Sequence, residues 1–180
     1  TCAVLLSVMG IPDDTAQQHR TSFGLLELLG YDESTPSSIV GALVAARQNS
    51  RGAREALSAE IWECLNSTYN ALPARVAAAR DFGPAPFFNY VRDRAATFAG
   101  SVDASMSQDA SHDVLVLGRS LERVDMTARL LAARIAAGRV GAGWTATLQA
   151  CSAHDAYLRT YRQGVEAPQV LEFLLVDRFF

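Results

Sequence analysis

The chain has 180 residues and a net charge of −3, with 49% hydrophobic and 19% charged residues, a balance typical of a globular protein rather than a disordered one. All 16 basic residues are arginine, which excludes the lysine-dependent chemistries: a Walker P-loop, a Schiff base with pyridoxal phosphate, or a kinase phosphate-binding lysine. The slightly acidic balance also argues against a nucleic-acid-binding protein.

The hydrophobic pattern predicts helices throughout. Helix-start signals are Asp13-Asp14, Thr35 followed by Pro36, Ser58 and Ser111, and Pro73 is expected to kink or end the fourth helix. The expected helices cover about residues 1–10, 13–30, 35–57, 58–73, 86–107, 111–137 and 144–163, with an eighth from residue 168; glycines 138, 141 and 143 end the sixth, and Gly164 ends the seventh. No segment alternates with a period of two, so the predicted fold class is all-α: an antiparallel bundle of seven or eight helices without a sheet.

The two ends of the chain resemble each other. Residues 26–32 (LELLGYD) match residues 171–177 (LEFLLVD) at an offset of 145 residues. The chain also begins inside an expected helix and stops on two phenylalanines. We therefore expect residues 1–180 to form a single helical domain that is truncated at both ends, with an N-terminal counterpart of the helix around residue 122 missing.

The helix expected over residues 111–137 carries the sharpest pattern. A helical wheel places a predicted core stripe of Leu117, Leu121, Val124, Ala128, Leu131 and Ile135 on one side. Near the opposite side lie Arg119, Glu122, Met126 and Arg129, and Asp125 precedes Arg129 by four residues. Two interpretations stay open: a solvated face with ordinary ion pairs, or a partly buried cluster whose arginines bind a carboxylate or phosphate.

A second basic stripe is expected on the helix over residues 35–57, where Arg47, Arg51 and Arg54 share one face. It is either a solvated face or a surface for the Glu122 helix or an acidic partner. Trp62 and Tyr69, seven residues apart, are predicted core aromatics. Phenylalanines 82, 87 and 88 with Tyr90 surround a proline-rich loop, which they either fix to the bundle or turn into a partner-binding patch.

Cysteine and histidine patterns give no strong site. Cys2, Cys64 and Cys151 form no C-x-x-C pair, which predicts a reduced, cytoplasmic protein, and no apolar run reaches the ~18 residues of a membrane span. His112 beside Asp109 and Asp113 is a weak metal pattern, because a carboxylate bundle needs Glu-x-x-His pairs. Cys151 with His154 and Asp155 is a weak protease pattern, since one helix rarely presents a triad. We expect no metal and no cofactor.

The stretch from Leu117 to Leu131 (LGRSLERVDMTARLL), with Glu122-Arg123 at its centre, resembles the signature of the bacterial alpha-E domain family. Residues 36–39, 45–51, 60–66 and 170–178 are similar to the same family, so the resemblance spans nearly the whole chain. It implies an all-helical domain with two Glu-Arg helices, of which only the late one is present. It also implies partners, since such domains accompany or are fused to circularly permuted ATP-grasp ligases and occur beside transglutaminase-like cysteine proteases.

Three functions remain open from the sequence. The first is a non-catalytic accessory module that docks on an ATP-grasp-type ligase and helps hold a peptide or amino-acid substrate. Its polar contact would come from Glu122 with Arg119, Arg123 and Arg129, beside Asp125 and the stripe of Arg47 and Arg51. The second is an enzyme that uses Glu122 as acid or base, which the flanking arginines disfavour for the acid role. The third is a purely structural scaffold.

Overall fold

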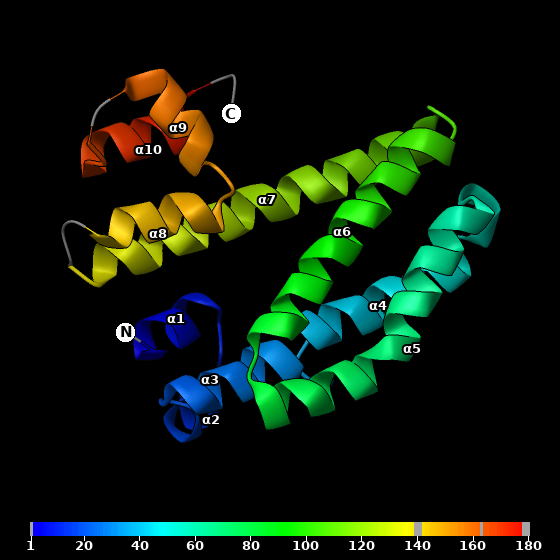
Figure 1. Ribbon diagram of the computed structural model, residues 1–180, viewed down its shortest axis with the longest axis horizontal. Coiled ribbons are helices and arrows are strands. Elements are labelled where there is room, and N and C mark those ends of the chain that lie inside the picture. Colours follow the sequence, from blue (N-terminus) through cyan, green and yellow to red (C-terminus); the bar gives the residue numbers. More distant parts are fainter. Residues whose placement is uncertain (1, 139–141, 163, 178–180) are drawn as a thin grey trace. The chain divides into compact units, whose positions relative to one another are not determined.

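The computed structural model describes residues 2–138, 142–162 and 164–177. The chain divides into two compact units, one of Thr1–Arg20 with Gly118–Phe180 and one of Thr21–Leu117. Within the described ranges the regular structure consists of ten α-helices with one π-helical and one 3₁₀ turn, and no strand occurs there (Figure 1). The all-α prediction is confirmed, and the number of helices exceeds the predicted seven or eight.

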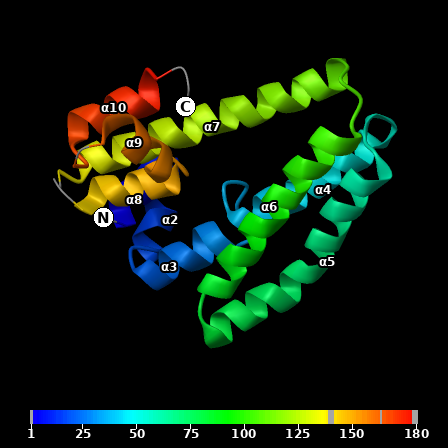
Figure 2. The ribbon, with the colours of Figure 1, turned by 45° about the horizontal axis from the view of Figure 1, so that its top comes forward.

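The unit Thr21–Leu117 is built around α5. Its elements are α3 (Ser22–Leu26), a π-helical turn (Glu27–Tyr31), α4 (Ile39–Gly52), a 3₁₀ turn (Arg54–Ala56), α5 (Ala59–Phe82), α6 (Ala85–Ser105) and the start of α7 (Ala110–Ala136). Both α4 and α6 pack along α5, as Figures 1 and 2 show from two directions. Two apolar clusters hold the unit together: one around Tyr31, Leu72 and Phe87, and one around Ile61 and Val102.

Side-chain caps decide where these helices begin. The Ser58 hydroxyl accepts a hydrogen bond from the Ile61 amide, so the predicted start of α5 is confirmed. For α4 the cap is Ser38, which accepts from the Gly41 amide, and not the predicted Thr35. Thr35 instead donates to the Asp32 carboxylate in the preceding turn, so α4 starts three residues later than the pattern predicts.

Two further helix boundaries differ from the prediction. The Asp109 carboxylate, rather than Ser111, accepts hydrogen bonds from the first amides of α7. The predicted helix over residues 35–57 ends at Gly52 and continues only as a 3₁₀ turn.

Pro73 does not end α5. The helix continues from Ala59 to Phe82 and changes direction along its length (Figure 1). Proline removes one backbone hydrogen bond and crowds the preceding turn, which favours a bend. Leu72 and Val76, on either side of Pro73, are buried in the apolar cluster, and this packing keeps the helix continuous.

The other unit contains α1 (Cys2–Val8), α2 (Asp13–Gln18), the rest of α7, α8 (Ala142–Ala150), α9 (His154–Tyr161) and α10 (Ala167–Leu175). Its core gathers Leu131 of α7 with Trp144, Leu148, Tyr157 and Phe173. Figure 2 shows α8 lying along the C-terminal half of α7.

Two long helices predicted in sequence are each divided in the structure. The helix expected over 13–30 is interrupted, because the Thr21 hydroxyl accepts from the Gly24 amide and starts α3. The helix expected over 144–163 is interrupted at Ser152, whose φ of 55° is left-handed and separates α8 from α9. Gly138 ends α7 with a φ of 61°, Gly143 lies inside α8, and Gly141 falls outside the described residues.

The internal repeat has a structural counterpart. In the first copy the Asp32 amide donates to the Glu27 carbonyl, and in the second the Asp177 amide donates to the Glu172 carbonyl, at 3.0 and 3.2 Å. Both bonds span five residues, the spacing of a π-turn rather than an α-helix. The two matched segments thus share one hydrogen bond of π-turn spacing, although residues 27–31 are π-helical and residues 172–175 are α-helical.

Candidate functional site: the Glu122-Arg123 segment of α7

The segment of α7 from Gly118 onward presents three faces, because successive helical residues are about 100° apart. Glu122 and Arg123 therefore point to different surfaces, although they are adjacent in sequence. Glu122 shares its face with Asp125 and Arg129, three and seven residues on. The Arg123 face continues with Met126, Thr127 and Leu130. The third face carries the apolar row.

Asp125 and Arg129 form a structural pair. The Arg129 Nε lies 2.7 Å from the Asp125 carboxylate, and its Nη1 donates to the carbonyl of Val8. Val8 is the last residue of α1, so the guanidinium satisfies a carbonyl that has no donor within its own helix. The hydrogen bond that Arg129 donates to Asp125 raises the pKa of Arg129, with a smaller contribution from the charge of Glu122. This pair fastens α1 to α7.

Glu122 and Arg119 lie on the surface of their unit, and both side chains are exposed. The interpretation of a solvated charged face is thus the one that the structure favours for Glu122. General acids are commonly carboxylates desolvated by apolar surroundings, and an exposed carboxylate lacks that environment.

Arg123 lines a cavity of about 440 Å³ between α7 and the turn that joins α8 to α9. The α7 wall consists of Arg123, Met126, Thr127 and Leu130, and the opposite wall of Ala150, Cys151 and Ser152. The left-handed Ser152 makes the turn that closes this side. The cavity thus combines apolar walls with a guanidinium and a hydroxyl, a combination that fits a ligand with an apolar part and a carboxylate.

Cys151 is a poor nucleophile in this cavity. Burial raises the pKa of its thiol, and the smaller opposing effects of the Thr127 hydroxyl and the Arg123 charge do not cancel it. A thiolate is the reactive form, so a raised pKa disfavours a protease role at neutral pH. His154, in the first turn of α9, lies 3.3 Å from Asp155.

The predicted core stripe of α7 is wrong for most of its members. Leu131 is buried at 4% exposure, whereas Leu121 and Val124 are 61% and 68% exposed, and Leu117 and Ile135 are also exposed. Ala128 is exposed as well. The wheel identifies an apolar row correctly, but burial depends on which neighbours cover it. Within its unit, α7 contributes Leu131 to the core cluster.

The basic stripe of α4 is used mainly for packing. The Arg47 Nε donates to the Asn66 side chain at 3.1 Å, and its guanidinium lies 4.3 Å from the Tyr69 ring centroid. Arg54 lies over Trp62 at 4.8 Å. Trp62 and Tyr69 are only half-buried, so these arginines complete their cover through cation–π contacts.

Arg51 and Arg54 are exposed, whereas Arg47 is half-buried. The aromatic residues around the proline-rich loop differ in burial. Phe87 is buried against Tyr31, which confirms its predicted anchoring role, whereas Phe82 is exposed.

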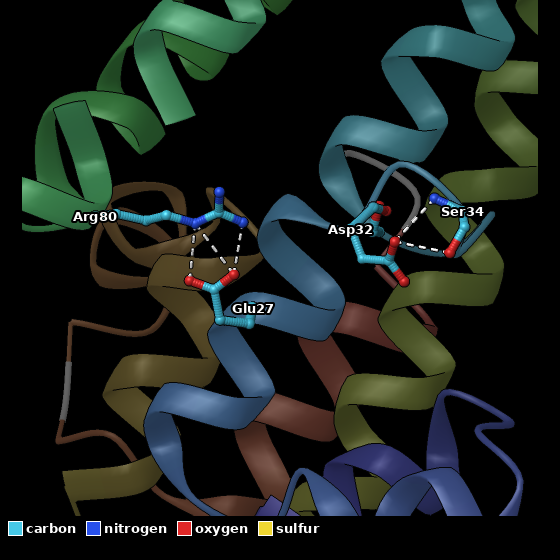
Figure 3. Close-up of polar contacts among 5 residues, drawn as sticks. Glu27, Asp32, Ser34 and Arg80 are labelled. Atoms are coloured by element: carbon cyan, nitrogen blue, oxygen red, sulfur yellow. Dashed lines mark hydrogen bonds and ion pairs between the residues drawn. The ribbon is translucent and has the colours of Figure 1, made fainter. Parts of the chain in front are cut away.

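Sequence reasoning missed a second polar constellation, in the unit Thr21–Leu117. Arg80 of α5 binds the Glu27 carboxylate of the π-turn with two nitrogens (Figure 3). Its guanidinium lies 5.6 Å from the centroid of the Tyr31 ring. Asp32 accepts hydrogen bonds from the amide and hydroxyl of Ser34 (Figure 3). Glu27 and Asp32 belong to the internal repeat of residues 26–32. That repeat is the feature of the sequence that could have indicated these two residues as candidates.

Among the described residues, no group of three or more histidine, cysteine, aspartate and glutamate side chains could hold a metal ion. His112 lies 3.9 Å from Asp113. None of the helices in the described ranges is both long and apolar enough to cross a membrane.

The fold and the α7 segment define an all-helical domain whose sharpest sequence feature is a Glu-Arg pair. The chain belongs to the alpha-E family: the family model, described as a predicted alpha-helical domain with a conserved ER motif, matches residues 1–180. Glu122-Arg123 is the only Glu-Arg dipeptide in the sequence, so the motif in that description falls on α7. No curated protein and no solved structure matches the chain.

Proposed function

We propose that this chain is a non-catalytic accessory module that binds a peptide or amino-acid substrate for a neighbouring amide-forming ligase of the ATP-grasp type. The observation that carries the proposal is the Arg123 cavity. A guanidinium at the edge of an apolar space of about 440 Å³ suits a carboxylate attached to an apolar group.

The ligand's carboxylate would bind the Arg123 guanidinium. Its apolar part would lie against Met126 and Leu130, and the Thr127 hydroxyl would offer one further hydrogen bond. Such a site orients a substrate but supplies no base or nucleophile, since Cys151 is held in its thiol form and Glu122 lies on another face.

One surface of α7 supports docking on a partner. Leu121 and Val124 form part of an exposed apolar row on α7, and Glu122 lies beside that row. We assign this surface to the ligase, because exposed apolar rows bordered by charge are typical of protein interfaces.

The test measures ADP release by an ATP-grasp-type ligase from the same genome, with and without the purified chain. The chain alone should turn over nothing, and adding it should change the ligase's ATP consumption. The variant Arg123→Gln should lose most of that change. Arg159→Gln is the matched control, since Arg159 is an exposed arginine of α9 away from the cavity, and it should act as wild type. No effect of the wild-type chain on any neighbouring ligase would refute the proposal.

A further inference from the structure

A second cavity with polar side chains in its wall lies in the unit Thr21–Leu117. A cavity of about 440 Å³ opens between the π-turn, α4 and α5. Its apolar walls are Val40, Val44, Leu72 and Val76. This volume is within the range of small-molecule sites, and it lies in the other compact unit from the Arg123 cavity.

Tyr31 contributes a buried hydroxyl that lacks a partner. The side chain lines the cavity and is only 5% exposed, and no described residue hydrogen-bonds its hydroxyl. Buried hydroxyls are nearly always hydrogen-bonded in folded proteins, so an orphan in a cavity wall indicates a missing partner. Burial raises the pKa of Tyr31, and this keeps the hydroxyl protonated and able to donate.

Pro73 removes one backbone donor from α5 beside the cavity. It has no N–H, so the carbonyl of Tyr69, four residues earlier in α5, loses its helical donor. Tyr69 and Pro73 both line the cavity. The backbone hydrogen bond that α5 lacks therefore falls between two residues of this wall.

Two opposite charges complete the lining. Arg80 is held by Glu27 through Nε and Nη2, the latter at 2.7 Å, which fixes the guanidinium and leaves Nη1 for another acceptor (Figure 3). Glu33 provides an exposed carboxylate, and Asn70 an amide. The cavity thus has one fixed cation and one anion around an aliphatic interior.

We propose that this cavity binds a free α-amino acid with an aliphatic side chain, as its zwitterion. The ligand's carboxylate would bind Arg80 and the Tyr31 hydroxyl, its ammonium group would donate to the Tyr69 carbonyl and Glu33, and its side chain would lie against the valines. A ligand without an ammonium group would leave Glu33 unmatched, and one without a carboxylate would leave the Tyr31 hydroxyl without an acceptor. The inference does not depend on the Arg123 site.

The test is isothermal titration of the full chain with L-leucine to about 10 mM, well above a Kd of about 1 mM. Two further probes separate the contacts: N-acetyl-L-leucine has no ammonium group, and L-leucinamide has no carboxylate. We expect L-leucine to bind, and each blocked form to bind at least about tenfold more weakly, the effect of losing a charged contact. No binding of L-leucine, or equal binding of all three compounds, would overturn the proposal.

Tyr31→Phe separates binding from folding. The hydroxyl has no partner in the free protein, so removing it should leave the melting temperature unchanged or higher while weakening L-leucine about tenfold. Tyr90→Phe is the control: Tyr90 packs under Arg75, outside the cavity lining, and should bind as wild type. Wild-type affinity of Tyr31→Phe would refute the role of the hydroxyl and with it the proposed site.

Glu33→Gln gives a second, independent readout on an exposed residue that the fold does not need. It should weaken L-leucine about tenfold but leave N-acetyl-L-leucine unchanged, because only the former carries the ammonium group. Glu63→Gln, an exposed glutamate of α5 outside the lining, should change neither. Equal loss for both probes would contradict the assigned orientation of the ligand. Arg123→Gln should leave all these affinities unchanged, so failure of the proposed function and failure of this site are distinguishable.

Discussion

Leu131 and Leu121 belong to the same apolar row of α7, yet the structure buries the first and exposes the second. Leu131 is 4% exposed and packs in the cluster with Trp144, whereas Leu121 is 61% exposed. Truncation of a buried leucine to alanine costs about 2.7–5 kcal/mol. Leu131→Ala should therefore lose about 3 kcal/mol. Leu121→Ala should stay within about 0.5 kcal/mol, since few of its contacts are lost.

Urea unfolding measures this difference. Trp144 is buried in the core that contains Leu131, so its fluorescence follows that unit, and a Trp62→Phe background removes the only other tryptophan. With a slope of about 1–3 kcal/mol per molar urea, the Leu131→Ala midpoint should fall by about 1–3 M. The Leu121→Ala midpoint should hardly move. Equal losses would show that the row is covered in solution, and would remove its support for a docking surface.

Three further predictions follow from the geometry. Glu122→Gln should change the free energy of unfolding by no more than about 0.5 kcal/mol, because the carboxylate is exposed; a loss near 3 kcal/mol by thermal denaturation would mean that it is buried. Gly41→Ala should lower the melting temperature of its unit by several degrees, because a Cβ there would overlap the Thr35 carbonyl oxygen; Gly100→Ala, whose Cβ would meet nothing within 4 Å, should be neutral or stabilising. The Cys151 thiol should react with iodoacetamide more slowly than a free thiol at pH 8, as followed by mass spectrometry of that peptide. Because the pKa of this thiol is higher in the folded than in the unfolded chain, its contribution to stability is complete below the unfolded-state pKa. That contribution is lost as the pH rises through the folded-state pKa. A urea midpoint that rises with pH over this range would contradict the assigned shift.

Periodicity and composition determined the class of fold. Alanine-rich segments with apolar residues at helical spacing and no alternating stretch can bury their apolar faces only by helix packing. Local signals also placed the start of α5, since Ser58 caps it through contacts within one turn. The Glu122-Arg123 segment and the repeat of residues 26–32 were visible for the same reason: each is a short run of sequence that needs no distant partner to be recognised.

Only the tertiary structure decided which surfaces are covered. The apolar row of α7 is identical in pattern at Leu121 and Leu131, but neighbouring helices bury only Leu131. The cavity beside Tyr31 requires Arg80, 53 residues beyond its partner Glu27, and no local rule relates positions so far apart. A helical wheel gives the directions of side chains around the axis of one helix. Burial and cavities arise from the packing of several helices, and that packing depends on contacts between residues distant in sequence.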